Sequence, residues 1–114
     1  MNVLDEANRL VHGERGAAYG HPFVDYACTA QMWRALIRRR YGVDLQLTAD
    51  FACLLMIAVK LSREAGKHKD DNLTDAAGYA ECAQMCVEKS VDDARIAGET
   101  FGELQKYGIP EPGR

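Results

Sequence analysis

The sequence predicts an all-α protein, and three observations lead to this fold class. Apolar residues recur three and four positions apart along most of the chain, as they do on one face of a helix. Glycine, proline and capping residues separate these periodic segments at short intervals. The segment 41–47 alternates apolar and polar residues, but no second run of this kind exists to pair with it. We therefore expect a bundle of four to five helices, with 41–47 as a loop.

The first two helices follow from their apolar faces and end signals. Residues 3–12 carry apolar side chains at i, i+3, i+4 and i+7 spacing. The connector 12–22 holds three glycines and Pro22, so we expect a loop there. Proline suits the first turn of a helix, and a second helix is predicted from Pro22 to about Arg40.

The later helices are predicted from caps as well as from periodicity. Thr48 is a plausible N-cap for a third helix from Ala49 to about Ala65, which Gly66 ends. A fourth helix is expected from residue 71 or 72 to about 89. The spacing of Ser90 and Asp93 has the form of a capping box, so a fifth helix is predicted to begin there.

The third helix is apolar over most of its circumference, which predicts burial in the bundle or in a subunit interface. A four-helix monomer of this size has little surface to cover such a helix. We therefore expect a homo-oligomer, a dimer or a tetramer.

Size and composition limit the classes of function. The 114 residues suit one domain, assigned to 1–106, followed by a tail at 107–114. The net charge of −3 argues against general nucleic-acid binding, which needs a basic surface. The longest apolar run, 51–59, is too short to cross a bilayer. The first residues show no signal-peptide pattern, and the four cysteines form no CxxC pair, so we expect a cytoplasmic protein with reduced thiols and no membrane partner.

Carboxylates around the turn between the third and fourth helices suggest a metal site. Asp71 and Asp75 lie one turn apart at the start of the fourth helix, and an antiparallel neighbour would bring Glu64 close to them. Oxygen ligands from two facing helices suit Mg²⁺. We expect Asp71, Asp75 and Glu64 to hold Mg²⁺, with Glu64 also the base that deprotonates a metal-bound water. The alternatives are that Asp71 only caps the helix and that the turn is simply solvated.

Cations beside these acids suggest a phosphorylated ligand. Lys60, Arg63 and Lys67 share one face of the third helix, and such cations bind phosphate oxygens. The alternative for Lys60 is an ordinary i, i+4 ion pair with Glu64. Asn72 and Tyr79, on the fourth helix, complete the binding residues that we assign in this region.

The glycine-rich connector 14–21 is a second candidate. Arg15 suits a phosphate contact, Tyr19 suits stacking on a base, and Asp25, in the helix that follows, suits a metal. The alternative is that Tyr19 fills the core and Arg15 pairs with a nearby acid.

Four sequence segments together resemble a known family. They are ERGAAYGHP at 14–22, Trp33, LLMIAVKLSREA at 54–65 and KDDNLTDAAGYAE at 69–81. This pattern, over about Leu4 to Cys86, resembles the small, mostly phage-encoded proteins of the DUF6378 type. Within it, DNLTDAAGYAE at 71–81 resembles the second acidic motif of the MazG-like all-α nucleotide pyrophosphohydrolases.

The MazG-like resemblance carries specific implications. Asp75 matches the last residue of the ExxD motif, whereas Asn72 stands in the place of its Glu, and the upstream ExxE motif has no counterpart. The resemblance implies a MazG-like fold and Mg²⁺-dependent hydrolysis of a nucleoside triphosphate to monophosphate and pyrophosphate, in the host cytoplasm if the protein is phage-encoded. Two alternatives stay open: a non-catalytic binder or sequestering protein for a nucleotide or nucleotide signal, and a helical interaction module.

Overall fold

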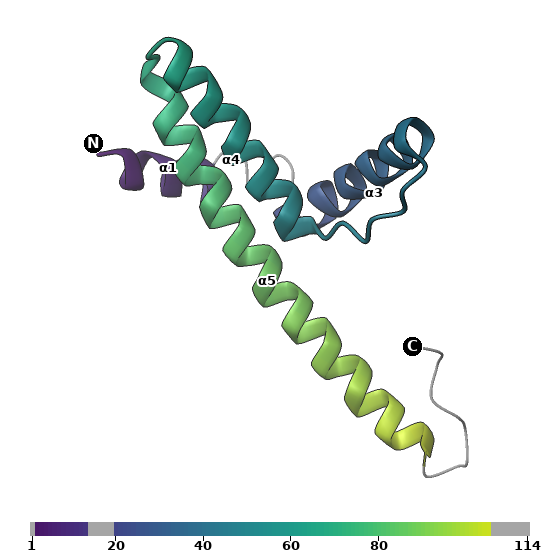
Figure 1. Cartoon of the computed structure of the whole chain (residues 1–114). Helices are drawn as coiled ribbons and strands as arrows, with labels where there is room; N and C mark the ends of the chain where they lie inside the picture. The colour runs from purple at the N-terminus through teal and green to yellow at the C-terminus, as the bar shows by residue number, and fades with distance from the viewer. Residues whose placement is uncertain (1, 14–19, 106–114) are drawn as a thin grey trace.

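A computed structural model of the chain describes residues 2–13 and 20–105, the last ten of them by backbone alone. The described part contains α1 (Val3–His12), α3 (Pro22–Tyr41), α4 (Ala49–Gly66) and α5 (Asp70–Gln105) (Figure 1). Within these residues there is no strand, so the predicted all-α class is confirmed. The loop expected at 41–47 lies at 42–48, because Tyr41 is the last residue of α3. None of the described helices is both long enough and apolar enough to span a membrane. The predicted tail, 107–114, lies outside the described residues.

Capping groups fix three of the helix ends in the described part of the chain. The side chain of Asn2 accepts a hydrogen bond from the backbone N–H of Asp5 at 2.8 Å, which starts α1. His21 Nδ1 accepts from the N–H of Phe23 at 3.1 Å, which starts α3 just before Pro22. Gly42, at φ +69°, ends α3 in the left-handed conformation that glycine adopts without strain.

The predicted helix break at Ser90 is wrong. α5 continues through this position to Gln105. The chain has neither glycine nor proline between Tyr79 and Ala97, so nothing interrupts the backbone hydrogen bonds. An i, i+4 ion pair of 2.8 Å between Lys89 Nζ and Asp93 Oδ1 bridges the expected break. A capping-box spacing is compatible with a helix interior when the helix has no other reason to stop.

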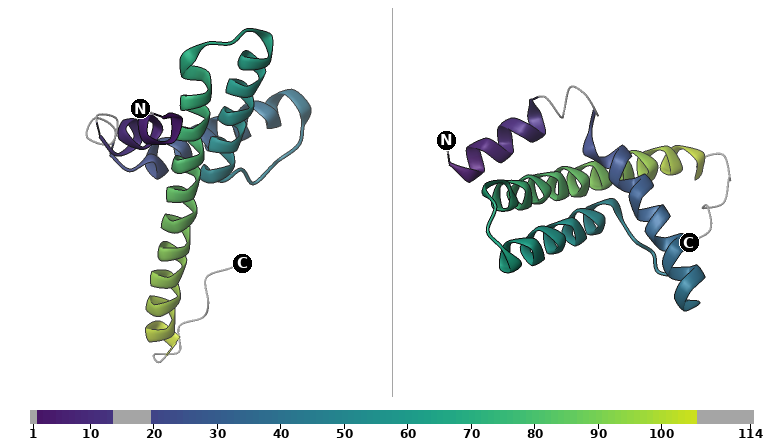
Figure 2. Two further views of the ribbon diagram at one scale, coloured as in Figure 1. Left: turned by 90° about the vertical axis from the view of Figure 1, so that its left-hand side faces the viewer. Right: turned by 90° about the horizontal axis from the view of Figure 1, so that it is seen from above.

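Helices α4 and α5 form an antiparallel hairpin, joined by a short turn at 67–69. Figure 2 shows α1 lying obliquely across the first part of α5, and α3 crossing the hairpin near the start of α4. Small residues fill the space where the four helices meet. The buried cluster consists of Val11, Ala49, Cys53, Cys82, Ala83 and Cys86, with Phe23, Tyr26, Ala27 and Met85 packed against it.

The core is small for so long a chain of helices. The molecule measures 59 × 37 × 20 Å and has a radius of gyration of 17.8 Å. A compact domain of this length has a radius of gyration of about 13 Å. Large apolar side chains on α3, α4 and α5 therefore stay exposed.

Candidate functional site

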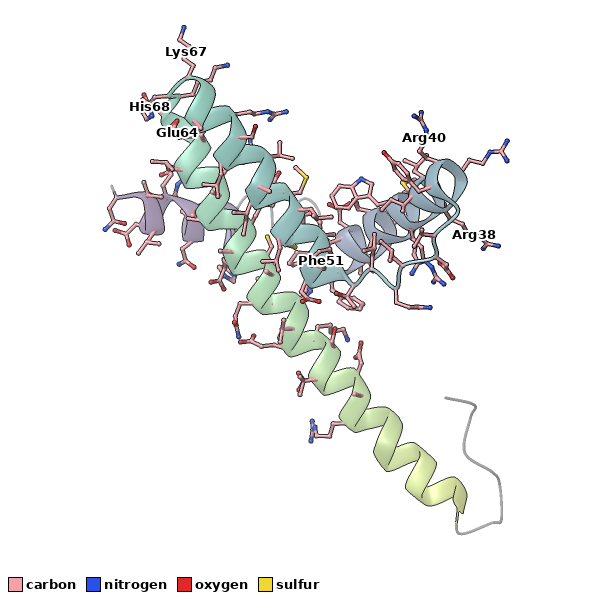
Figure 3. The ribbon with its side chains drawn as sticks, in the orientation of Figure 1. Arg38, Arg40, Phe51, Glu64, Lys67 and His68 are labelled. Atoms are coloured by element: carbon pink, nitrogen blue, oxygen red, sulfur yellow. The ribbon has the colours of Figure 1, made fainter. Side chains whose placement is uncertain are left out.

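The turn between α4 and α5 is organised around the carboxylate of Glu64. Glu64 Oε1 accepts from the backbone N–H of Lys69 at 3.1 Å and from Asn72 Nδ2 at 3.3 Å. Its Oε2 lies 2.6 Å from Nδ1 of His68 (Figure 3). The hydrogen bond with His68 is the main cause that lowers the pKa of Glu64. The same hydrogen bond is the main cause that raises the pKa of His68. Glu64, predicted as the base, thus has a structural role in closing the turn.

Asp75, predicted to hold a metal, is paired with a lysine instead. Its Oδ2 lies 2.8 Å from Lys60 Nζ, and both side chains are only 14% exposed. This contact bridges α4 and α5 in the middle of the hairpin. Lys60 was predicted to contact a phosphate or to pair with Glu64, but its ammonium group lies beside Asp75.

The remaining charged residues of the predicted site face solvent. Arg63, Lys67 and Asp71 are exposed and make no ion pair with another described residue. Figure 3 shows Lys67 at the end of the hairpin, pointing away from the helices. Asn72, in contrast, is buried at 3% exposure and is held by Glu64.

The acids do not gather into a metal centre within the described residues. No group of three or more histidine, cysteine, aspartate or glutamate side chains there is arranged to hold a metal ion. Glu64, Asp71 and Asp75 therefore do not fit the Mg²⁺ site that their spacing suggested. The reason is local: the turn hydrogen bonds occupy Glu64, and Lys60 neutralises Asp75.

A cavity lies between α1, α3 and α5, next to the Lys60–Asp75 pair. Its volume is about 270 Å³. One wall is the α5 sequence around Asp75 and Tyr79, and the opposite walls come from the end of α1 and the start of α3. The lining residues are Ala7, Leu10, Val11, Gly20, Pro22, Asp25, Tyr26, Thr74, Asp75, Gly78, Tyr79 and Cys82.

The lining combines aromatic surface with hydrogen-bond acceptors. The rings of Tyr26 and Tyr79 meet edge to face, with centroids 6.1 Å apart. Burial raises the pKa of Tyr26, so its hydroxyl stays protonated and can donate. Asp25 from α3 and Asp75 from α5 place carboxylates on the same cavity.

The structure brings only some of the predicted residues together. Asp75 and Tyr79 line the cavity, and Lys60 contacts Asp75. Arg15 and Tyr19 lie outside the described residues.

Tyr26 and Thr74 were missed as cavity residues. A usable signal existed on α5, where Thr74, Gly78 and Cys82 recur every four residues and so share a face. No pattern within α3 indicated that Tyr26 would meet that face.

Comparison with known proteins identifies the family. Residues 2–87 match the domain of unknown function DUF6378. The chain belongs to this family. The matched range contains α1, α3, α4, the turn and every residue that lines the cavity.

Two phage proteins are similar to the chain. It is 31% identical over 106 residues to the Gene 55 protein of Mycobacterium phage D29, covering 92% of this chain and 66% of that protein. It is 30% identical over 82 residues to the Gene 55 protein of Mycobacterium phage L5, covering 70% of this chain and 49% of that protein. The chain thus spans only part of the length of these relatives. No solved structure matches the chain.

Proposed function

We propose that the protein binds a nucleotide, with the base in the cavity between α1, α3 and α5. The observation that carries this proposal is the composition of the cavity: two tyrosines and two aspartates around a hollow of about 270 Å³. The resemblance of residues 71–81 to the acidic motif of the MazG-like pyrophosphohydrolases supports a nucleotide as the class of ligand, and a MazG-like fold is part of the same proposal.

Cavity size argues for partial burial of the ligand. Small-molecule sites usually measure about 300–1,000 Å³, and this cavity lies just below that range. A base, with part of its sugar, suits such a volume better than a whole nucleoside triphosphate.

The charge of the cavity lining sets the orientation of the bound nucleotide. A phosphate inside the cavity would face the carboxylate of Asp25, and like charges at short range repel. The carboxylate of Asp75 lies on the same cavity, but the ammonium group of Lys60 offsets its charge. The ring N–H and amino groups of a base are donors, and these carboxylates are acceptors. The base therefore enters and the phosphates remain outside, and the exposed Arg63 and Lys67 add positive charge to the general field of the protein.

Mg²⁺ accompanies the phosphates in this proposal and is not held by a carboxylate cluster of the protein. The described residues contain no group of three metal-ligating side chains for it, so the proposal includes no hydrolytic step through Glu64. Binding without hydrolysis, in the host cytoplasm, is the function that the described geometry supports best.

A thermal-shift series over nucleosides and nucleotides, with and without Mg²⁺, tests the proposal. A ligand that binds only the folded state at about 100 times its Kd stabilises that state by about 2.7 kcal/mol. For a domain of this size the shift in Tm is roughly 10 °C. Asp75→Asn should reduce the shift, because it removes one acceptor from the cavity.

Asp71→Asn is the matched control. It makes the same change one turn earlier on α5, at an exposed position outside the cavity. If both variants lost the ligand-induced shift in Tm to the same extent, the metal site predicted from the sequence would be favoured over the cavity. The absence of a shift with every nucleoside and nucleotide would refute the proposal. Release of pyrophosphate in the presence of Mg²⁺, lost in Glu64→Gln, would show that the protein is an enzyme.

A further inference from the structure

Two exposed apolar stripes run along the α4–α5 hairpin. The stripe on α4 consists of Phe51, Leu54, Ala58, Leu61 and Ala65, and all five side chains are exposed. The stripe on α5 consists of Leu73, Ala80, Gln84, Val87 and Val91, also all exposed. We call the two stripes together the seam. No charged residue interrupts either of them.

The spacing in both stripes follows a heptad repeat. On α4 the steps alternate between three and four residues from Phe51 to Ala65. On α5 they are seven, four, three and four residues from Leu73 to Val91. A repeat averaging 3.5 residues keeps one face of a helix against a neighbouring helix over several turns. Within the described part of the chain, no helix occupies that position.

Both stripes lie on one side of the hairpin. On α5, Cys82 and Cys86 belong to the core with Cys53 of α4, and Gly78 approaches Val11 of α1. Helical periodicity places the α5 stripe on the remaining third of its circumference. The same reasoning turns the α4 stripe away from the core residues Ala49 and Cys53. The seam therefore lies opposite α1, which passes behind α5 in Figure 1.

The stripes match each other in position along the hairpin. Contacts at the turn join Glu64 with Asn72, and further along join Lys60 with Asp75. Residues 51–65 of α4 thus run beside roughly residues 72–88 of α5, and the seam is one continuous surface two helices wide.

The chain exposes more surface than a compact monomer of the same mass. The chain exposes 8306 Å². A compact monomer of 12.6 kDa exposes about 6200 Å². The difference, about 2000 Å², belongs to the whole extended chain, of which the seam is one part.

The far part of α5 adds to this exposed surface. Every side chain from Glu88 to Arg95 is exposed, and Figure 1 shows α5 running on beyond the other helices. In proteins most of the stability of a helix comes from packing of an apolar face, which the far part of α5 lacks within the described residues. Val91 continues the stripe into this part, so a partner on the seam would also support it.

We propose that a second copy of this chain covers the seam, so that two α4–α5 hairpins pack as a four-helix bundle around a two-fold axis. A second copy is the occupant because both helices of the hairpin carry exposed apolar residues at heptad spacing on the same side. The seam can then supply both the inserting side chains and the spaces that receive them. Gln84 is the one polar residue within it.

Sedimentation equilibrium of the purified protein tests the proposal. The wild-type mass should be twice 12.6 kDa at micromolar concentration. Leu54→Glu should raise the dimer dissociation constant at least about tenfold, because it places a carboxylate in the apolar seam. Gln84→Leu should lower that constant, since it removes the polar group.

Leu36→Glu on α3 is the matched control, because Leu36 is also an exposed leucine, at 66%, but lies outside the seam. It should leave the dimer intact. Circular dichroism establishes that each variant is folded, and the opposite effects of Leu54→Glu and Gln84→Leu separate docking from loss of fold. A folded wild-type monomer, or a dimer that Leu36→Glu dissociates and Leu54→Glu does not, would overturn the proposal.

Discussion

The Lys60–Asp75 ion pair allows the effect of burial on the energy of an ion pair to be tested at a fixed N–O distance. Lys89 and Asp93 form a second pair with the same 2.8 Å separation between Nζ and a carboxylate oxygen. The side chains of the first pair are each 14% exposed, whereas those of the second are 45% and 46% exposed. The two pairs therefore share a distance but differ in their access to water, and the first joins two helices whereas the second lies within one.

The expected energies follow from that difference. Exposed pairs contribute about 0.2–1 kcal/mol, and about 0.3–0.5 kcal/mol when they are four residues apart on a helix. Removing one partner of a fully buried pair costs about 3–5 kcal/mol. Lys60 and Asp75 are mostly but not fully buried, so we expect a coupling energy of about 1–3 kcal/mol. For Lys89 and Asp93 we expect at most about 0.5 kcal/mol.

Double-mutant cycles with alanine at each position measure both coupling energies. The free energy of unfolding is obtained by urea denaturation of each variant, at one protein concentration because of the proposed dimer. Asp75→Ala alone should lower Tm by roughly 4–12 °C, since about 4 °C corresponds to each kcal/mol at this size. Equal coupling energies for the two pairs would refute the argument from burial.

Three further predictions concern the turn, the thiols and α5. Since Glu64 is the main cause that raises the pKa of His68, Glu64→Gln should lower that pKa in an NMR titration more than Asp70→Asn does. Because the pKa of His68 is raised, its contribution to stability is fully present below the ordinary histidine pKa of 6.5. Because the pKa of Glu64 is lowered, its contribution is fully present above the ordinary glutamate pKa of 4.5. The contribution of the pair is therefore greatest between these values, and it is lost as pH rises through the folded pKa of His68 or falls through that of Glu64. Cys28 is exposed whereas the other three cysteines are buried, so a thiol reagent should modify one group per folded chain rapidly, and Cys28→Ser should remove that phase. Val91→Pro should lower the helix content seen by circular dichroism relative to Val91→Ala, because proline disrupts a continuous helix, whereas a helix that began at Ser90 would tolerate it.

Most helix ends were predictable because their signals are local. Pro22 and Gly66 mark ends that the structure reproduces within a residue or two, since proline and glycine act on their own backbone. The capping-box spacing at Ser90 gave a wrong prediction, although it is also a local signal. A capping spacing lowers the cost of starting a helix but does not end the helix already in progress.

The candidate site was less predictable because its geometry is not local. The acids and cations of residues 60–75 were identifiable from the sequence, but the hydrogen bonds and ion pairs of their side chains decide which of them meet. Glu64 turned toward Lys69 and His68, and Asp75 toward Lys60. The cavity joins Leu10, Tyr26 and Tyr79 from three helices, and only the way that these helices cross brings the residues together.

The cavity and the seam occupy different faces of α5, and this separation makes the two proposals independent. Thr74, Gly78 and Cys82 line the cavity, whereas Leu73, Ala80 and Val87 belong to the seam. Neighbouring residues on a helix point about 100° apart, so adjacent positions such as 73 and 74 serve different surfaces.

A seam variant that dissociates the dimer should therefore keep a cavity able to bind its ligand. A cavity variant that loses the ligand should keep the dimer. If Leu54→Glu abolished both association and ligand binding in a folded protein, the two surfaces would be coupled. The base-binding site would then have to include residues of the second copy, in place of the single-chain cavity proposed above.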